Sequence, residues 1–416
     1  MENLKAAVSE KWEALKTAVS TTVENLKTAV TTTWNNLKTT VSTTVENLKT
    51  AVSEKWEALK TAVKEAHEKK AKVYVTCNTL PREDELKRLP DYLMFLQEIG
   101  VDALIIADLG VMRLAGRYAP RLGRHVSTQL GVINSATANV LYDMGADTVV
   151  LARETPLEDI RRIRAETPKD LKIEAFVHGA MCVSFSGRCL LSNYLTGRDA
   201  NRGQCAQPCR WKYHLVEEKR PGEYYEISED GVTYIFNSRD LCMIEHLPEL
   251  IDAGVSSFKI EGRTKSAYYA GVITNAYRHA IDAALRGEQP DRVWIEETEK
   301  VRHRPYSTGF FYGYPGQHVA ASSYTSTYEV AAIVESCDEE GNAVLTQRNK
   351  FGRGDELELL SREGFPIAFT AEEMFDGEGN AIECAPRAVM TVNMKLPRYA
   401  EPLSIIRKQR KQECFS

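Results

Sequence analysis

The sequence contains no run of about 18 apolar residues, the length at which a segment is interpreted as a membrane-spanning helix. Its first residues, Met1-Glu-Asn-Leu-Lys5, also lack the apolar core of a secretory signal peptide. Positive charge is not in excess, because 53 lysines and arginines are outnumbered by 58 aspartates and glutamates, for a formal net charge of −5. A nucleic-acid site would therefore have to be a local patch. We expect a cytoplasmic protein without a membrane span.

Two hydrolase motifs are also missing, since the sequence has neither HExxH nor GxSxG. Proteolysis needs an activated nucleophile beside a base, or a catalytic metal with a bound water. His178 is close in sequence to Ser184 and Ser186, but no third residue can be assigned to orient such a pair. The sequence therefore argues against the common metal-dependent and serine-dependent hydrolases.

Residues 2–67 consist of six consecutive eleven-residue repeats, from ENLKAAVSEKW to EALKTAVKEAH. Leu occupies the third position of each repeat, Val the seventh, and Trp or Val the eleventh, except for His67 in the last repeat. Eleven residues are close to three α-helical turns, so these side chains stay on one face. Segment 1–67 is predicted to be an amphipathic helix that packs on the body or self-associates. A membrane-surface helix is disfavoured, because the polar face is Thr-rich and mixed in charge.

Segment 68–300 alternates short apolar runs with helical patterns, and this alternation predicts a parallel sheet. The number of such units favours a TIM-like (β/α) barrel, a fold whose chemistry sits at the carboxyl ends of the strands. The expected strands are Lys72–Cys77, Ala103–Ala107, His125–Gln129, Thr148–Ala152, Ile173–Val177, Tyr234–Asn237 and Ser257–Ile260. The expected helices are Glu83–Ile99, Ser135–Met144 and Pro156–Ala165.

Segment 301–416 begins with a linker rich in Gly and aromatic residues and continues as short strand patterns. The expected strands are Thr327–Val334, Ala343–Gln347, Glu356–Leu360, Arg387–Asn393 and Leu403–Ile406. This spacing predicts a small all-β domain, with a role in binding or assembly.

Five of the nine cysteines fall between Cys182 and Cys242. In a reducing compartment, clustered thiols are better explained as soft-metal ligands than as disulfides. Only Cys205-x3-Cys209 approaches the ligand spacing of a zinc ribbon. Wide and unequal spacing favours an iron–sulfur cluster held by several loops, with zinc or uncoordinated thiols as the alternatives.

The runs EAFVHGAMCVSFSGRCLLS, from Glu174 to Ser192, and RGQCAQPCRW, from Arg202 to Trp211, resemble the signature of the collagenase-like peptidase family U32. The resemblance extends from about residue 61 to the C-terminus. It includes the strand-end motifs Val75–Asn78, Asp108–Gly110, Ser127–Gln129, Phe236–Cys242 and Lys259–Arg263. The family includes tRNA uridine hydroxylases that make wobble 5-hydroxyuridine using prephenate, as well as rRNA and ubiquinone hydroxylation proteins. The tRNA branch is the most similar.

The resemblance implies a tRNA partner, a dianionic donor such as prephenate, and a 4Fe–4S cluster, with zinc as the alternative metal. The implied cluster ligands are Cys182, Cys189, Cys205 and Cys242, which leaves Cys209 as a neighbour. The expected catalytic residues are His178, Glu174, Arg239 and Asp240. The expected substrate-binding residues are Gln129, Arg153, Lys259, Glu261 and Arg263.

Two other functions compete with this hypothesis. The family name implies a peptidase. The N-terminus departs from the family pattern, because the repeats occupy the place of the first one or two barrel strands. That exchange would leave an open barrel with an exposed sheet edge, and it could make the protein an inactive scaffold.

Overall fold

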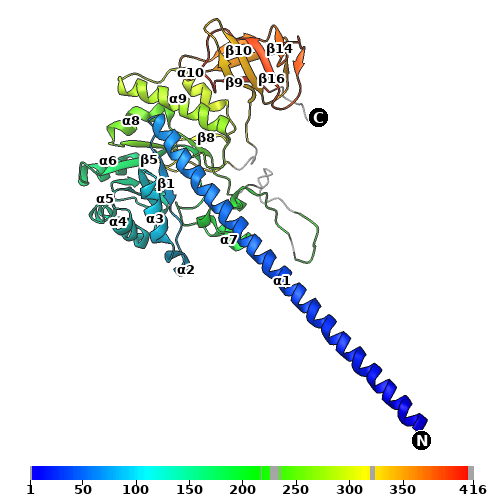
Figure 1. The fold of residues 1–416 in the computed structure, drawn as a ribbon. Coiled ribbons are helices and arrows are strands. Elements are labelled where there is room, and N and C mark those ends of the chain that lie inside the picture. The colour runs from blue at the N-terminus through cyan, green and yellow to red at the C-terminus, as the bar shows by residue number, and fades with distance from the viewer. Residues whose placement is uncertain (1, 217, 225–233, 235, 319–323, 411–416) are drawn as a thin grey trace. The chain divides into compact units, whose positions relative to one another are not determined.

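A computed structural model describes residues 2–216, 218–224, 234, 236–318 and 324–410 (Figure 1). The chain forms two compact units, each described here by itself. The first unit comprises Met1–Val73 and Phe95–Asp102, and the second comprises Tyr74–Met94 and Ala103–Ser416. No helix in these described ranges combines the length and the apolar character that crossing a bilayer requires.

The first unit is dominated by α1, a single helix from Glu2 to Glu68 that contains all six repeats (Figure 1). Its threonine hydroxyls are hydrogen-bonded within the helix, as Thr17 Oγ1 donates to the Glu13 carbonyl at 2.9 Å. Such bonds give these hydroxyls a partner within the helix, although back-bonding to the i−4 carbonyl slightly destabilises a helix. Near its end, the Trp56 ring meets the Phe95 ring edge-on, with centroids 4.3 Å apart.

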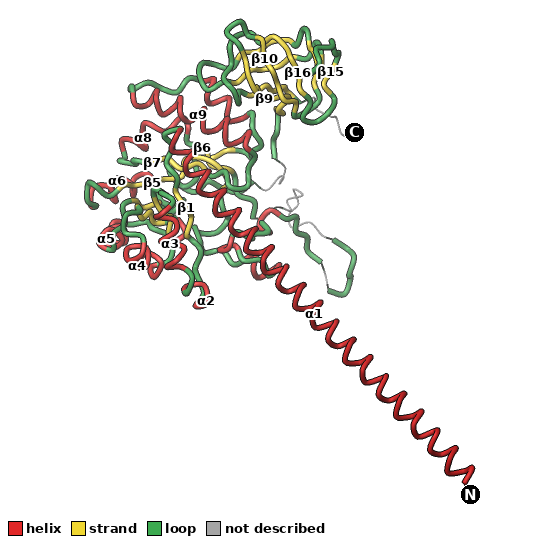
Figure 2. Tube along the Cα trace, in the orientation of Figure 1, coloured by secondary structure: helices red, strands yellow, loops and turns green. Residues whose placement is uncertain are grey.

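The second unit contains an eight-stranded sheet whose main path runs β1-β2-β3-β4-β5-β6-β8, with β7 also paired to β5 (Figure 2). Its strands are β1 (Tyr74–Cys77), β2 (Ala103–Ile106), β3 (Gly123–Val126), β4 (Thr148–Val150), β5 (Lys172–Ala180), β6 (Asp240–Cys242), β7 (Ser257–Ile260) and β8 (Tyr306–Ser307). Strands β1 to β5 are parallel to one another, and β7 is parallel to β5. All four residues of β2 are buried, as expected for an apolar strand covered on both faces.

Helices follow most strands of this sheet. They are α2 (Glu83–Leu86), α3 (Leu89–Glu98), α4 (Leu109–Tyr118), α5 (Ser135–Asp143), α6 (Leu157–Glu166), α7 (Leu191–Thr196), α8 (Leu247–Asp252), α9 (Ala267–Leu285) and α10 (Arg292–Glu299). Short 3₁₀ turns are η1 (Thr128–Leu130), η2 (Ala200–Arg202), η3 (Pro208–Arg210) and η4 (Ile244–His246). After α5 the chain turns through Gly145, whose φ of +92° is a conformation that glycine adopts without strain.

Three expectations need correction. The helix expected over Glu83–Ile99 is two helices, α2 and α3, and Pro90 lies in the first turn of α3, where its missing N–H costs no hydrogen bond. Tyr234, Phe236 and Asn237 are not in a strand, whereas β6 begins at Asp240, and residue 235 lies outside the described residues. A closed barrel is not confirmed, because β1 pairs only with β2 among the described strands.

The C-terminal part is an antiparallel seven-stranded sheet in the order β13-β12-β17-β9-β10-β16-β14. The strands are β9 (Tyr328–Cys337), β10 (Asn342–Gln347), β12 (Glu356–Leu360), β13 (Ile367–Thr370), β14 (Met374–Asp376), β16 (Thr391–Lys395) and β17 (Ile405–Gln409). A separate pair joins β11 (Phe351–Gly352) to β15 (Cys384–Ala385). The expected all-β region is therefore present.

Asp108 follows β2 and caps helix α4, since its carboxylate accepts a 2.9 Å hydrogen bond from the Val111 backbone N–H. We expect Asp108→Ala to lower the unfolding free energy by about 1 kcal/mol, because the backbone donor loses its partner. Asp143, an exposed carboxylate at the last residue of α5, provides the control. Asp143→Ala should not destabilise, since a negative charge near a helix C-terminus is unfavourable. Urea unfolding of the two variants gives the comparison, and equal losses would contradict the capping role.

Candidate functional site: a cysteine-lined cavity

A cavity of about 660 Å³ lies at the carboxyl ends of the parallel strands. Its wall combines residues that follow successive strands with residues of the loop after β5. The strand-end lining includes Thr76, Asn78, Ser127, Thr128, Gln129, Arg153, Glu154, Phe176, Lys259, Glu261 and Arg263. The loop contributes Cys182, Ser186, Arg188, Cys189, Asp199, Asn201, Cys205 and Cys209. The structure therefore brings together all five expected substrate-binding residues and three of the four expected cluster ligands.

Arg153, after β4, is held by three neighbours. Its guanidinium lies 3.9 Å from the centre of the Phe176 ring, donates to the Ala180 carbonyl, and approaches the Glu261 carboxylate at 3.4 Å. Burial lowers the pKa of Arg153, while the Glu261 charge opposes that shift. These contacts fix the side chain in one orientation on the cavity wall.

Lys259 and Glu174 form an ion pair across neighbouring strands. Lys259 Nζ lies 2.9 Å from Glu174 Oε1, and the other carboxylate oxygen accepts a 2.8 Å hydrogen bond from Ser257. Glu174 is 5% exposed and does not line the cavity, so its partners neutralise a buried charge. The expected catalytic role of Glu174 stays a prediction, and its position favours support of Lys259.

Arg263 differs from the other two cations of the expected binding set. Its backbone N–H binds Glu261 Oε1 at 2.9 Å, but its guanidinium makes no ion pair in the described part of the chain. The guanidinium lies against Gly203, where an added Cβ would come 1.9 Å from Nη2. Of Arg153, Lys259 and Arg263, only the Arg263 guanidinium thus has no carboxylate partner in the described chain, and it can bind an added anion.

The cysteine loop is attached to the sheet through Glu154. The two carboxylate oxygens of Glu154 accept hydrogen bonds from the Ser186 backbone N–H and from its hydroxyl, each at 2.9 Å. Farther along the loop, the Ser192 hydroxyl donates to the Arg198 carbonyl and accepts from the Ala206 N–H, both at 2.9 Å. These bonds position the loop that carries the cavity cysteines.

Cys242 is the expected ligand that the cavity wall does not include. It lies on β6 opposite His178, and its sulfur is 3.9 Å from the Tyr277 hydroxyl. Burial raises the pKa of Cys242 to about 11, so metal binding there would have to release a proton. Cys209, which sequence reasoning set aside, lines the cavity instead, and the Cys205-x3-Cys209 spacing is the signal that pointed to it.

His178 is 1% exposed and lies outside the cavity wall. Its ring nitrogens approach the hydroxyls of Tyr277 and Tyr306, at 3.3 and 3.4 Å. Burial lowers the pKa of His178 to about 3, so the ring is neutral at physiological pH. This surrounding favours a packing role, and the predicted catalytic role has no support from the position of His178.

Asp240 is paired with Arg304, and neither side chain is more than 1% exposed. Arg304 Nε and Nη2 lie 2.9 and 2.6 Å from Asp240 Oδ1, and the Arg304 backbone N–H lies 3.1 Å from Oδ2. Burial opposes ionisation, yet the Arg304 and Lys265 charges hold the pKa of Asp240 below its usual value. Neither Asp240 nor the neighbouring Arg239 lines the cavity, so both predicted catalytic roles remain without geometric support.

Four cysteines of the cavity are possible ligands of the expected iron–sulfur cluster. Cys182, Cys189, Cys205 and Cys209 border one cavity, and four thiols are the ligand type and number that iron–sulfur clusters use. In the described ranges, however, no three His, Cys, Asp or Glu side chains converge closely enough to hold a metal ion. The cavity cysteines thus match a cluster in ligand type and in sharing one cavity, but their described side chains are not arranged as a metal site.

Gln129 supplies the polar acceptor of the cavity. Its Oε1 atom is buried and has no hydrogen-bond partner among the described residues, although the residue lines the cavity. A buried acceptor without a partner costs free energy, so a bound ligand with an N–H donor would be stabilised there.

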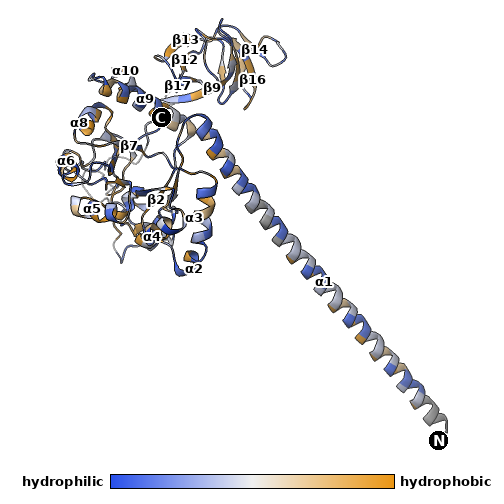
Figure 3. Ribbon diagram, turned by 60° about the vertical axis from the view of Figure 1, so that its left-hand side comes forward, coloured by the Kyte–Doolittle hydropathy of each residue, from blue (hydrophilic) through white to orange (hydrophobic). Residues whose placement is uncertain are grey.

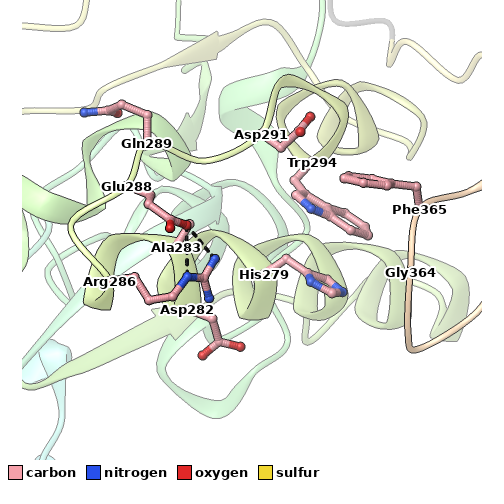
Figure 4. A pocket seen from close by; sticks show the side chains of 10 residues that line it. All are labelled: His279, Asp282, Ala283, Arg286, Glu288, Gln289, Asp291, Trp294, Gly364 and Phe365. Carbon is pink, nitrogen blue, oxygen red and sulfur yellow. Dashed lines mark hydrogen bonds and ion pairs between the residues drawn. The ribbon is translucent and has the colours of Figure 1, made fainter.

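A second cavity of about 450 Å³ lies beside α9 and α10 (Figure 4). His279 stacks on Trp294 with ring centroids 3.9 Å apart, and Trp294 in turn stacks on Phe365 at 5.7 Å. Arg286 and Glu288 neutralise each other at 2.7 Å. The aromatic stack joins α9 and α10 to the loop at Phe365, and the lining of this cavity offers no thiol for the expected chemistry.

Comparison with known proteins identifies the relatives of this chain. Residues 12–321 match the sequence profile of peptidase family U32, and residues 326–407 match that of the peptidase family U32 C-terminal domain. The chain is 36% identical over 345 residues to tRNA hydroxylation protein P1 of Bacillus subtilis, covering 81% of both chains. It is 37% identical over 383 residues to tRNA hydroxylation protein P of Escherichia coli, covering 81% of this chain and 84% of the relative.

A third relative acts on another RNA. The chain is 40% identical over 255 residues to a 23S rRNA 5-hydroxycytidine synthase of Escherichia coli. That match covers 59% of this chain and 37% of the relative.

Proposed function

This chain belongs to peptidase family U32, and from that premise we propose that it is an RNA-modifying enzyme that hydroxylates the wobble uridine of a tRNA to 5-hydroxyuridine. The names of its relatives, which concern hydroxylation of tRNA and rRNA, support this reaction class. The observation that carries the proposal is the cavity, whose lining combines three expected cluster ligands with Arg263 and Gln129.

The reaction replaces the C5–H bond of uridine by a C5–O bond, which oxidises the base by two electrons. The proposed co-substrate is prephenate, which would give up one oxygen atom and take up those two electrons. Prephenate carries two carboxylates, and a guanidinium fork binds a carboxylate through two parallel hydrogen bonds. We assign this role to Arg263, because Arg153 and Lys259 already face Glu261 and Glu174.

The uracil would be recognised through its N3–H group. The buried Gln129 Oε1 atom, which has no partner in the described chain, is an acceptor suited to that donor. Phe176 also borders the cavity, but it is 6% exposed and the Arg153 guanidinium lies 3.9 Å from the centre of its ring, so it is not the surface on which a base would stack.

The proposed cofactor is a 4Fe–4S cluster held by Cys182, Cys189 and Cys205, with Cys242 as the fourth ligand. When bound, such a cluster supplies one-electron transfer at a potential set by its charge, hydrogen bonds and exposure. The protein contributes the anchored loop, through the Glu154–Ser186 bonds, and a wall that holds the donor and the base.

Peptidase activity is less well supported by the same geometry. No histidine lies on the wall of the described cavity, and the Ser186 hydroxyl is bonded to Glu154 instead of to a base beside a substrate. Acyl transfer by serine needs such a base within hydrogen-bond reach.

The decisive experiment uses a bacterial strain from which its own tRNA hydroxylation genes have been deleted. Expression of this chain should restore 5-hydroxyuridine, measured by mass spectrometry of tRNA nucleosides. Absence of the nucleoside, with the protein present and folded, would reject the proposed reaction and favour an inactive scaffold. Cleavage of denatured collagen by the purified chain would favour the peptidase.

The cluster is tested by cysteine substitution. Anaerobically purified protein should contain about four iron and four sulfide per chain, and Cys182→Ala, Cys189→Ala or Cys205→Ala should remove most of both. The family resemblance predicts the same loss for Cys242→Ala and retention for Cys209→Ala. Cys337→Ala, a half-buried cysteine at the end of β9, is the control. If Cys209→Ala lost iron while Cys242→Ala kept it, the fourth ligand would be Cys209 and not Cys242. One zinc per chain in the purified protein, in place of iron, would contradict the cluster.

A further inference from the structure

Helix α1 exposes a row of large apolar side chains along one face. The ten members between residues 8 and 41 are each 46% to 66% exposed. We call this row the α1 stripe; it consists of Val8, Trp12, Leu15, Val19, Val23, Leu26, Val30, Trp34, Leu37 and Val41. In Figure 3, short orange segments of the α1 ribbon alternate with blue and pale ones, as expected for a helix that mixes apolar and polar residues. Exposed apolar rows of this length mark interaction surfaces.

Equivalent positions of the last two repeats, toward the C-terminal end of α1, are covered by other residues of the chain. Trp56, at the eleventh position of its repeat, packs edge-on against Phe95 within the first unit. Val63, at the seventh position of the last repeat, is only 1% exposed. The repeats are therefore able to bury this face, and the α1 stripe is the part for which the described chain supplies no cover.

The spacing of the α1 stripe indicates which kind of surface covers it. Its members follow one another at steps of four, four and three residues, which is a single row and not a broad face. A single row is the seam of a coiled coil, and an eleven-residue period gives a seam with slight right-handed supercoiling. A helix that lies on a lipid surface needs a broader apolar face and a strongly charged polar face.

The charge on α1 also fits a protein partner better than a lipid surface. Several lysines of the described repeats pair with glutamates on the same helix, as in Lys16–Glu13 at 2.8 Å and Lys27–Glu24 at 3.3 Å. A helix whose cations are balanced in this way has little net attraction for anionic headgroups.

We propose that the α1 stripe is covered by the α1 stripe of a second copy of this chain, in a parallel two-helix coiled coil. Because every repeat has the same period, two copies can align their apolar rows over the whole described length. This inference concerns assembly and is independent of the reaction that the cavity performs.

Flanking residues of the central repeats favour the parallel orientation. At about 100° per residue, the fourth position of each repeat lies on one side of the stripe and the tenth on the other. In the central repeats these positions hold lysine (Lys16, Lys27, Lys38) and threonine (Thr22, Thr33, Thr44), respectively. In a parallel pair the lysine side of one helix faces the threonine side of its partner. In an antiparallel pair lysines would face lysines, and the like charges would repel.

The size of the contact sets the expected concentration range. The α1 stripe is about 50 Å long and a helix is about 10 Å wide, so each copy offers roughly 500 Å². That area is below the ~800 Å² per partner of a typical stable interface. The dimer should therefore dissociate on dilution, and its molecular mass must be measured across a range of concentrations.

The test compares the full chain with two triple variants by sedimentation velocity. Leu15→Glu, Leu26→Glu and Leu37→Glu together place three carboxylates in the stripe. Thr21→Glu, Thr32→Glu and Thr43→Glu add the same charge on the opposite face of the same repeats. We expect a concentration-dependent dimer for the unmodified chain and the threonine variant, and at least a tenfold increase in the dissociation constant for the leucine variant.

Orientation is measured by energy transfer between fluorophores attached enzymatically at the N-terminus. A parallel pair brings the two labels together and should give high transfer, which the leucine variant should lose. A dimer without transfer would reject the parallel arrangement. A dimer that survives in the leucine variant would place the contact elsewhere.

A chain that remains monomeric at all concentrations would overturn the proposal. Flotation with phosphatidylcholine vesicles then tests the other class of surface. Vesicle binding by the monomer, lost in the leucine variant but not in the threonine variant, would assign the α1 stripe to a lipid surface instead.

Discussion

Arg304→Met is expected to lower the unfolding free energy of the second unit by about 3–5 kcal/mol, the usual cost of leaving one member of a buried ion pair without its partner. Arg304 is fully buried and contacts Asp240 through its backbone N–H, Nε and Nη2, while Nη1 reaches the Asn237 side chain at 3.0 Å. Without the guanidinium, the Asp240 carboxylate keeps the backbone N–H of position 304 and, at 3.8 Å from Oδ2, the Lys265 charge as its neighbours in the described chain. Urea unfolding followed by circular dichroism measures the loss.

Two further variants establish the cause. The double variant Asp240→Leu/Arg304→Met should recover most of the loss, since a buried ion pair can often be replaced by apolar side chains at little cost. Arg278→Met, which removes an exposed pair with Asp282 on α9, should leave the unfolding curve unchanged. Full stability of Arg304→Met alone would show that the pair is hydrated and not buried.

The same variants separate structure from catalysis at Asp240. The resemblance assigned a catalytic role to this residue, whereas its carboxylate is 1% exposed and lies off the cavity wall. We expect tRNA hydroxylation to follow stability and to return in the double variant. A double variant that is stable and inactive would restore the catalytic assignment.

Arg263→Met is expected to raise the apparent KM for prephenate by about 10- to 100-fold, the equivalent of losing a charged hydrogen-bond pair worth about 1.5–3 kcal/mol. The reason is that Arg263 is the cation of the expected binding set whose guanidinium has no carboxylate partner in the described chain. Arg263→Lys should lose less, because it keeps the charge and gives up the fork. The apparent KM comes from initial rates of 5-hydroxyuridine formation, with isothermal titration of prephenate as a second measurement.

Gly203 permits a test that leaves the Arg263 charge in place. An added methyl group at Gly203 would meet the Arg263 guanidinium, so Gly203→Ala should raise the prephenate KM in the same direction. Gly197 has a φ of +68°, close to the +73° of Gly203, but a Cβ added at Gly197 would meet open space. Gly197→Ala thus carries the same backbone strain and should leave the KM unchanged. If Gly203→Ala and Gly197→Ala changed the prephenate KM equally, or if Arg263→Met left the KM unchanged, Arg263 would not be a prephenate-binding residue.

Local patterns in the sequence were sufficient for several of the elements. Strand Ser257–Ile260 has the predicted bounds, and the expected helices at 135–144 and 156–165 are α5 and α6 with ends shifted by at most one residue. Helix and strand periods are properties of consecutive residues, so they can be recognised without knowing the fold. The missed split between α2 and α3 is also local, since Pro90 marks the start of the second helix.

The candidate site depends both on the order of elements along the sequence and on the tertiary structure. The order of strands and loops along the chain predicts that polar residues and cysteines gather at the strand ends. The structure agrees for the expected binding residues, since one cavity is lined by Gln129, Arg153, Lys259, Glu261 and Arg263. The direction of each side chain does not follow from that order. The register of β5 against β7 shifts between Phe176 and His178, so His178 is buried among tyrosines although Phe176, two residues earlier, lines the cavity.

The sequence by itself determined the repeat helix, the alternation of strands and helices, the C-terminal β region and the clustering of thiols. Each of these features depends on the spacing of residues along the chain. The tertiary structure alone decided that Cys209 shares a cavity with the other loop cysteines, that Cys242 lies beside Tyr277, and that Arg304 neutralises Asp240. The physical reason is that burial and charge pairing join residues far apart in the chain. Asp240 and Arg304 are 64 positions apart, and no local period relates them.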